Sequence, residues 1–186
     1  MRPLFQIVSD LVVGADILRQ RPYGVIEVVD GRFRRVLLRP LPKIVSAPKI
    51  LLFGGLCHRI CGGDRLLLYY NQPRRFPNFL VLKYVVSARQ TGFATVCRAL
   101  AVLDEIARLK RSDALLCDVS NWRISPRLMA REGWQAHCPS RWHRHYIKRF
   151  YGQYPSPPPW LADGTQFAVV PQGEDAAAQV ENALTS

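Results

Sequence analysis

The sequence lacks any apolar run long enough to cross a membrane. Runs such as ILLF (50–53) fall far short of the roughly 20 apolar residues that a membrane-spanning helix needs. The start of the chain also lacks the basic and apolar regions of a secretory signal peptide. The five cysteines are an odd number, which excludes a disulfide framework that pairs all of them. We therefore expect a soluble protein of the reducing cytoplasm with no membrane partner.

Acidic residues are scarce, and basic residues are missing from the end of the chain. The 186 residues contain 26 Lys and Arg but only 14 Asp and Glu, which gives a net charge of +12. No Lys or Arg lies beyond residue 150, whereas four of the acids do, so the excess of positive charge is concentrated in residues 1–150. Such a field attracts nucleic acid, acidic lipid or a phosphate-bearing cofactor, although arginines that only solvate a surface give the same composition.

Two clusters of cysteine and histidine do not form a recognisable metal site. CHRIC (57–61) offers two thiols and one imidazole, whereas zinc needs four ligands and no second cysteine pair follows. In the other cluster, His137, Cys138, His143 and His145, only the last two would share a face of a strand. We expect no metal.

Apolar patterning predicts a strand-rich first half. YGVIEVVDGRFRRVLLRPLP (23–42) contains two β-branched runs around Asp30-Gly31, which is typical of a hairpin. RLLLYYNQ (65–72) predicts a strand, PRRFPN (73–78) a loop, and FLVLKYVVS (79–87) a long central strand.

The second half alternates helices and strands. Apolar residues at helical spacing predict a helix from Gly92 to Lys110, with Arg98, Glu105 and Arg108 on its wet side. A buried strand (114–119), a short helix (125–133) and a closing strand pair (134–138 and 141–151) follow. The tail beyond residue 154 turns proline-rich and then acidic, so we expect it to pack loosely, with a strand at QFAVV (166–170). A helix between two central strands requires a right-handed crossover and parallel pairing, so the fold class is α+β with a mixed sheet.

RQTGFAT (89–95) lies where the central strand ends and the long helix begins. A helix N-terminus presents unpaired N–H groups, glycine lets a phosphate approach them, and a leading arginine adds donors. Arg89, Gly92 and Ala94 meet these needs. A plain tight turn would also use such a glycine, and the motif alone leaves both interpretations open.

The surrounding residues resemble the GNAT superfamily of acyl-CoA-dependent N-acetyltransferases. Members carry Arg/Gln-x-x-Gly-x-Gly/Ala between a central strand and a helix, and this chain has RQTGFA (89–94). The next strand is usually succeeded by an Asn, a short helix and Gly-aromatic, which match Asn121, 125–133 and Gly133-Trp134. The resemblance covers about residues 65–151.

The resemblance implies a GNAT-like mixed central β-sheet flanked by helices, with one long helix joining a parallel central strand pair. Residues 65–151 would be the acyl-CoA-binding core, 1–64 the N-terminal part of the same domain on the acceptor side, and 152–186 a loosely packed or disordered tail. Acetyl-CoA, the acyl donor, would bind where strands 79–87 and 114–119 splay apart. The implied cofactor-binding residues are Val85, Val86, Ser87, Arg89, Gln90, Thr91, Gly92, Phe93, Ala94, Thr95 and Asn121.

The usual acid and base of that family are missing. Met129 stands where many members have a tyrosine that protonates the departing thiolate, and a thioether cannot donate a proton. Strand 79–87 has no carboxylate, only Lys83 and Tyr84. Tyr84 remains a candidate donor and Asp118 a candidate base, although an Asp at a strand end is more often a cap.

Three functions compete on this basis. The first is N-acetyl transfer from acetyl-CoA to an unidentified amine, and the second is a non-catalytic GNAT-like module that binds CoA or a partner. The third is a nucleic-acid-binding protein, because RWHRHYIKRFY (141–151) interleaves basic and aromatic residues and Arg123, Arg127 and Arg131 form a basic row. A half-buried edge strand and a solvated helix face also produce these two patterns, and we favour them over nucleic-acid contact.

Overall fold

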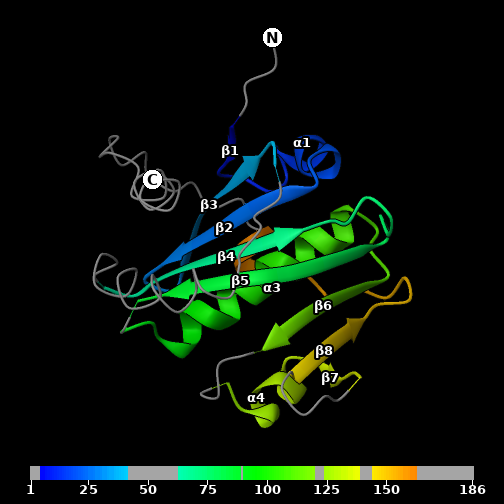
Figure 1. Cartoon of the computed structure of the whole chain (residues 1–186). Helices are drawn as coiled ribbons and strands as arrows, with labels where there is room; N and C mark the ends of the chain where they lie inside the picture. Colours follow the sequence, from blue (N-terminus) through cyan, green and yellow to red (C-terminus); the bar gives the residue numbers. More distant parts are fainter. Residues whose placement is uncertain (1–4, 42–62, 89, 120–123, 139–143, 163–186) are drawn as a thin grey trace.

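The computed structural model describes residues 5–41, 63–88, 90–119, 124–138 and 144–162 (Figure 1). The strands are β1 (Gln6–Val8), β2 (Tyr23–Val29), β3 (Arg32–Arg39), β4 (Arg65–Asn71), β5 (Phe79–Ser87), β6 (Ala114–Val119), β7 (Gln135–Ala136) and β8 (Arg144–Arg149). The helices are α1 (Ala15–Gln20), α3 (Phe93–Leu109), α4 (Pro126–Arg131) and α5 (Pro159–Ala162). No helix in these described ranges is long and apolar enough to span a membrane.

The eight strands of the described residues form one mixed sheet in the order β1-β3-β2-β4-β5-β6-β8-β7. Every neighbouring pair is antiparallel except β5 and β6, which run parallel and are joined through α3. The parallel central pair, the long crossover helix and the closing strand pair β7–β8 are therefore confirmed. The α+β class is confirmed with them, and the arrangement is consistent with a GNAT-like fold.

The predicted hairpin forms β2 and β3. Asp30 and Gly31 both have positive φ, 51° and 66°, as a two-residue turn between twisted strands requires. Although β3 directly precedes β4 in the sequence, it is β2 that lies beside β4 in the sheet.

The main core lies on the face of the sheet that α3 covers (Figure 1). The fully buried stripe of α3 consists of Ala99, Val102, Leu103, Ile106 and Ala107. Phe93, the first apolar residue of the helix, is exposed. A smaller apolar cluster on the opposite face consists of Val25, Leu67, Tyr69 and Val86, with Leu37 and Tyr84 packed against it.

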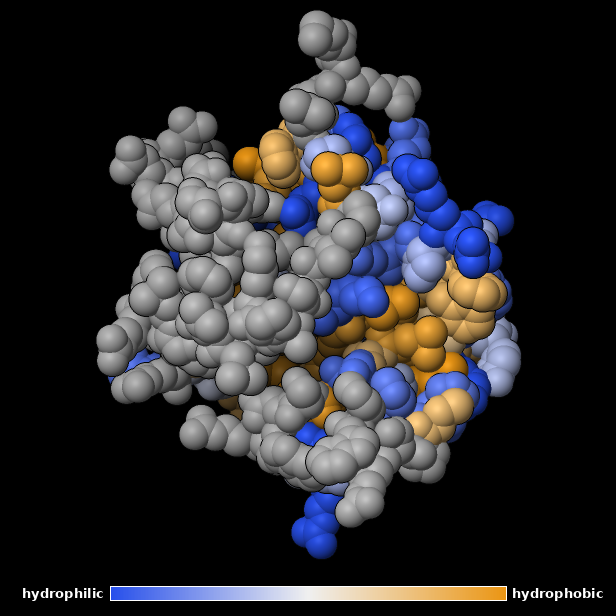
Figure 2. All heavy atoms as spheres, viewed as in Figure 1, coloured by the Kyte–Doolittle hydropathy of each residue, from blue (hydrophilic) through white to orange (hydrophobic). Residues whose placement is uncertain are grey.

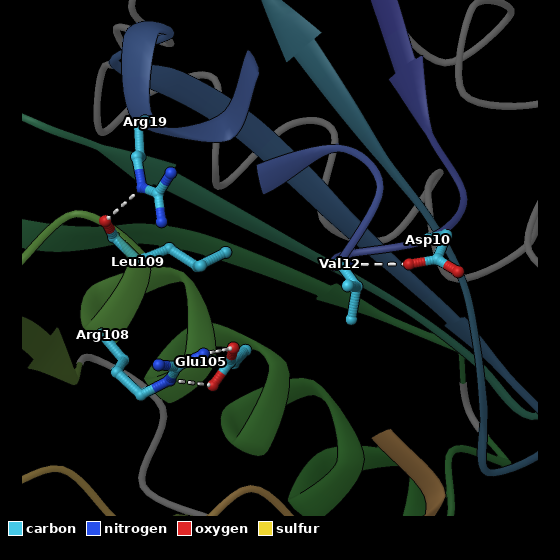
Figure 3. A network of polar contacts seen from close by, with 6 residues as sticks. All are labelled: Asp10, Val12, Arg19, Glu105, Arg108 and Leu109. Atoms are coloured by element: carbon cyan, nitrogen blue, oxygen red, sulfur yellow. Dashed lines mark hydrogen bonds and ion pairs between the residues drawn. The ribbon is translucent and has the colours of Figure 1, made fainter. Parts of the chain in front are cut away.

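Glu105 corrects the expectation that it marks the wet side of α3. Its side chain is buried, and its carboxylate accepts hydrogen bonds from the Arg108 guanidinium at 2.7 and 2.5 Å (Figure 3). Near the end of the same helix, Arg19 Nε of α1 donates to the Leu109 carbonyl at 3.3 Å. The helical periodicity of the sequence correctly predicted α3. It did not predict that the ion pair with Arg108 would allow the charge of Glu105 to be buried.

The start of the tail packs more closely than we expected. Tyr154 stacks against Phe150 with ring centroids 4.9 Å apart, and its hydroxyl donates to the Ser112 carbonyl. Trp160 packs against the core and lies under the Arg98 guanidinium, 3.8 Å from the ring centroid. Two aromatic side chains therefore hold residues 154–160 against α3. The predicted strand at 166–170 lies outside the described residues.

Candidate functional site

The parallel strands β5 and β6 separate halfway along β5. Their pairing runs from Phe79↔Ala114 to Leu82↔Cys117. Beyond that point β5 continues beside β4 to Ser87, whereas Asp118 and Val119 pair with β8. The two strands therefore diverge as expected. After Leu82, the edge of β5 that faces β6 no longer pairs with β6.

A β-bulge at Lys83 explains where the divergence begins. Tyr84 pairs with Tyr69 and Leu82 pairs with Tyr70, so Lys83 is an extra residue in β5 without a position opposite it in β4. A bulge bends its strand and increases the local twist. Lys83 directly follows the last pair with β6, so the bend turns β5 away from β6 at that residue. Nothing in the apolar run FLVLKYVVS indicated a bulge.

The bulge also decides which side chains of β5 face α3. After it, Val85 pairs with Leu68 and Ser87 with Leu66, and directly opposed residues lie on one face of a sheet. Leu66 and Leu68 belong to the core under α3 and are fully buried, yet Val85 is 39% exposed. A valine exposed on an otherwise buried face means that the described side chains do not fill the space beside β5 beyond the bulge.

The helix α3 begins directly after this part of β5. Its N-cap is Gly92, in an extended conformation, and Gly92 has no side chain to cap the helix. The predicted start of the helix is confirmed within one residue. The N–H groups of the first turn have no partner within a helix, so this end attracts a negatively charged group.

An aspartate of the same chain occupies part of that position. Asp64, directly before β4, accepts the Gly92 N–H at 2.9 Å and the Thr95 hydroxyl at 2.7 Å. Thr95 Oγ1 in turn accepts the N–H of Gly31 at 2.9 Å, which links the helix start to the β2–β3 turn. We expected a free amide at Gly92, and this is wrong because the Asp64 carboxylate takes it.

The residues fit the two parts of CoA to different degrees. The exposed edge of β5 and the space beside Val85 fit a pantetheine arm, because an extended chain can bind along an unpaired strand edge. The Gly92 end does not provide an open cradle: a Cβ at this glycine would lie 3.3 Å from Asp64 Oδ2. A pyrophosphate could use the Gly92 amide only where the carboxylate is displaced.

Two implied cofactor residues, Arg89 and Asn121, lie outside the described residues. Gln90 and Thr91 are described, and the Thr91 hydroxyl donates to the Arg65 carbonyl at 2.9 Å, so it fixes the loop before α3. Phe93 and Ala94 are exposed in the first turn, where the Phe93 ring lies 4.4 Å from the Arg131 guanidinium of α4.

Met129 is part of the apolar core. Ser125 caps α4 by accepting the Leu128 N–H, as predicted, and Met129 is only 6% exposed within the core. Gly133 ends this helix with a φ of 81°. The thioether therefore packs α4 against the sheet.

The two candidate catalytic side chains lie on the face opposite α3. Tyr84 packs against Tyr69 with ring centroids 6.0 Å apart. Asp118 is exposed beside His145, with Oδ1 and Nδ1 3.9 Å apart, and both side chains also make contacts with other groups. Figure 2 views this face and shows hydrophobic surface over β5 and β6, bordered by hydrophilic side chains. An amine acceptor could approach the divergence from this side.

A buried carboxylate on this face had no signal in the sequence. Glu27 of β2 is buried between Arg35, whose Nε donates at 2.7 Å, and Arg65. Two guanidinium groups compensate the burial of its charge, which suits a structural ion pair better than a proton acceptor.

Tyr146 and Phe150 of the interleaved basic and aromatic segment do not form a stacking platform. Tyr146 and Phe150 are buried in the core, so a half-buried strand explains their spacing. CHRIC (57–61) and His143 lie outside the described residues. Among the residues that the structure does describe, no three His, Cys, Asp or Glu side chains are grouped to hold a metal ion.

Comparisons with known proteins add one structure. No family model matches the chain, and no curated protein matches it. Among solved structures, the crystal structure of nourseothricin acetyltransferase is similar, with 12% sequence identity and a TM-score of 0.37, over 79% of this chain and 99% of that one. A likeness at this TM-score is too weak to support a conclusion about this protein, so its function has to be inferred from the geometry of its own residues.

Proposed function

We propose that this protein is a GNAT-like N-acetyltransferase that moves an acetyl group from acetyl-CoA to an amine. The observation that carries the proposal is the divergence of β5 from β6 after Leu82↔Cys117, together with the start of α3, whose N-cap is Gly92, shortly after β5 ends. A strand edge and a helix N-terminus that meet in this way can bind an extended chain that ends in phosphates.

In this proposal the backbone of Val85, Val86 and Ser87 binds the pantetheine arm. The amides from Gln90 to Thr95, together with Arg89, bind the pyrophosphate, and Asn121 contacts the pantetheine. The thioester supplies an activated acetyl group, which the amine attacks directly. Backbone N–H groups of β5 beyond the bulge would polarise the thioester carbonyl, and such donors are effective because they are already oriented.

Proton transfer is the least specified part of the proposal. Tyr84 is the candidate donor and Asp118 the candidate base, both on the face where the amine would approach. A thiolate whose conjugate acid has a pKa of about 8.5 leaves without much help, so a weak or absent acid slows the reaction without abolishing it.

A non-catalytic GNAT-like module is the second candidate, and Asp64 favours it. A carboxylate 2.9 Å from the Gly92 nitrogen repels a pyrophosphate at the same amide, because two anions compete for one donor. The buried Met129 adds to this, since it leaves α4 without an acid at that position.

Calorimetric titration with acetyl-CoA and with free CoA tests the binding common to both candidates. Release of free thiol in the presence of a panel of amines then separates them. Micromolar binding with thiol release that falls in Tyr84→Phe supports the enzyme, and Phe79→Leu, which changes an aromatic residue at the far end of β5, serves as the control. Binding without thiol release leaves the module, and absence of CoA binding refutes both.

A further inference from the structure

Three turns meet at the end of the sheet where β5 and β6 begin and β8 ends. The Asn78 side chain donates to Asp113 Oδ2 at 2.5 Å, and the Asp113 N–H donates to the Asn78 carbonyl at 2.7 Å. The Phe150 N–H donates to the Asp113 carbonyl at 2.8 Å. The β4–β5 turn, the end of α3 and the turn after β8 are therefore adjacent, on the right of Figure 1.

These turns expose cations and aromatic rings together. We call this surface the basic–aromatic end face, and it consists of Arg74, Arg75, Phe76, Arg111 and Tyr151. Phe76 is 60% exposed and Tyr151 is 78% exposed. Within the described residues, none of the three guanidinium groups pairs with a carboxylate.

Two of these side chains occupy backbone positions that favour glycine. Arg111 has a φ of 53° directly after α3, where Ser112 N–H donates to the Ala107 carbonyl in the usual helix-ending motif. Tyr151 has a φ of 48° in the turn after β8. A non-glycine residue with left-handed backbone is disfavoured, so the chain has a cation and a ring where glycine would give a more stable fold.

The rings are presented on short, anchored turns. Phe76 packs at 78° against Phe79, with centroids 6.4 Å apart, and its N–H donates to the Pro73 carbonyl. Tyr151 follows Phe150, which is buried in the core and bonded to Asp113. Aromatic rings on fixed turns lose little conformational freedom when a ligand stacks on them.

We propose that the basic–aromatic end face binds single-stranded nucleic acid. Guanidinium groups without carboxylate partners bind the phosphates of the strand, and exposed rings beside them stack on its bases. This surface lies at the opposite end of β5 from Ser87, about 26 Å away at the rise of a β-strand, so the inference does not depend on acyl-CoA binding.

The test is fluorescence anisotropy of a labelled oligouridylate and a labelled oligodeoxythymidylate at several salt concentrations. Three phosphate contacts predict a slope of log affinity against log salt of about −2, at about −0.7 for each contact on a single strand. The double variant Arg74→Ala/Arg75→Ala should reduce this slope to about −0.7 and weaken binding at least tenfold. Its matched control is Arg34→Ala/Arg127→Ala, which removes two exposed arginines elsewhere and should leave the slope unchanged.

Tyr151→Gly and Arg111→Gly separate binding from folding. Each removes a side chain from a left-handed position, so each should raise the urea midpoint of unfolding while lowering affinity for the oligonucleotide about five- to tenfold. Failure of the wild-type protein to bind either oligonucleotide in low salt overturns the proposal. An equal loss in the matched control overturns it as well. Binding to phosphatidylserine vesicles without binding to oligonucleotides would identify the end face as a membrane contact instead.

Discussion

Asp64 should stabilise the start of α3 and at the same time weaken the binding of CoA. Its carboxylate accepts the Gly92 N–H and the Thr95 hydroxyl, and Thr95 is completely buried. Asp64→Ala removes both acceptors and leaves a buried hydroxyl proton without its partner. We expect the free energy of unfolding to fall, and α3 to fray from its first turn.

The magnitude follows from the two hydrogen bonds. A hydrogen bond to a charged group contributes about 1.5–3 kcal/mol, and the Thr95 oxygen still accepts from Gly31, so Asp64→Ala should cost about 3 kcal/mol. Asp64→Asn keeps one acceptor and the side-chain volume, so it should cost about 1 kcal/mol, mainly through the lost charge at the helix N-terminus.

Asp10 provides a matched control. Its carboxylate also accepts two hydrogen bonds, in this case from the N–H groups of Val12 at 2.7 Å and Val13 at 3.1 Å, but in an exposed turn (Figure 3 shows the first). Asp10→Ala should therefore cost only about 1 kcal/mol, because water can replace a solvent-exposed cap. Urea unfolding followed by circular dichroism measures all three variants against the wild type.

The same variants report on the cofactor. If CoA phosphates use the Gly92 amide, Asp64→Asn should bind free CoA about tenfold more tightly than the wild type, although it is the less stable protein, because a repelling charge is gone. An Asp64→Ala cost no larger than that of Asp10→Ala would refute the role of Asp64 in stability. Unchanged or weaker CoA binding in Asp64→Asn would refute the competition for the amide.

Three further variants test other parts of the structure. Gly92→Val should weaken CoA binding in calorimetry and lower the urea midpoint, because its Cβ would lie 3.3 Å from Asp64 Oδ2; unchanged values in both would mean that the glycine is only a turn residue. Met129→Tyr should lower thermal stability by about 1–3 kcal/mol without raising thiol release, since the larger ring overpacks a buried site, and a gain in turnover would contradict the packing of α4. Burial lowers the pKa of Lys110 to about 8 in the folded protein, whereas the side chain has a pKa of about 10.4 in the unfolded chain. Between these two pH values the unfolded chain binds more protons, so the free energy of unfolding rises with pH. From pH 7 to pH 10 the wild type should therefore gain about 2 kcal/mol of stability relative to Lys110→Met, and a constant difference between the two would contradict the lowered pKa.

Local patterns in the sequence predicted the central fold because each one has a local cause. Asp30-Gly31 accepts positive φ, Ser125 and Pro126 start a helix, and Gly133 ends it. The parallel pair β5–β6 followed from the length of the helix between the two strands. These features need no information about distant residues.

The candidate site was predicted less well because its decisive features come from distant parts of the chain. The bulge at Lys83 is defined against β4, and the residues after it change faces, so Val85 rather than Tyr84 lies toward α3. Asp64 reaches Gly92 from 28 positions earlier in the sequence. Met129 matched a catalytic position by spacing alone, whereas packing against the sheet decides its environment.

The position of β2 beside β4 has a consequence for the way this chain reaches its folded state. The hairpin β2–β3 closes over two residues and β4–β5 over a short turn, so each can form by itself, whereas Val29 pairs with Arg65, 36 positions later. Closing the longer loop costs more chain entropy, so we expect two hairpins to form first and to join edge to edge afterwards. Until they join, β2 and β4 each present an open edge with apolar side chains such as Val25 and Leu67. Slow joining would thus favour pairing between separate chains, and expression at high concentration should lose protein to aggregation at this step.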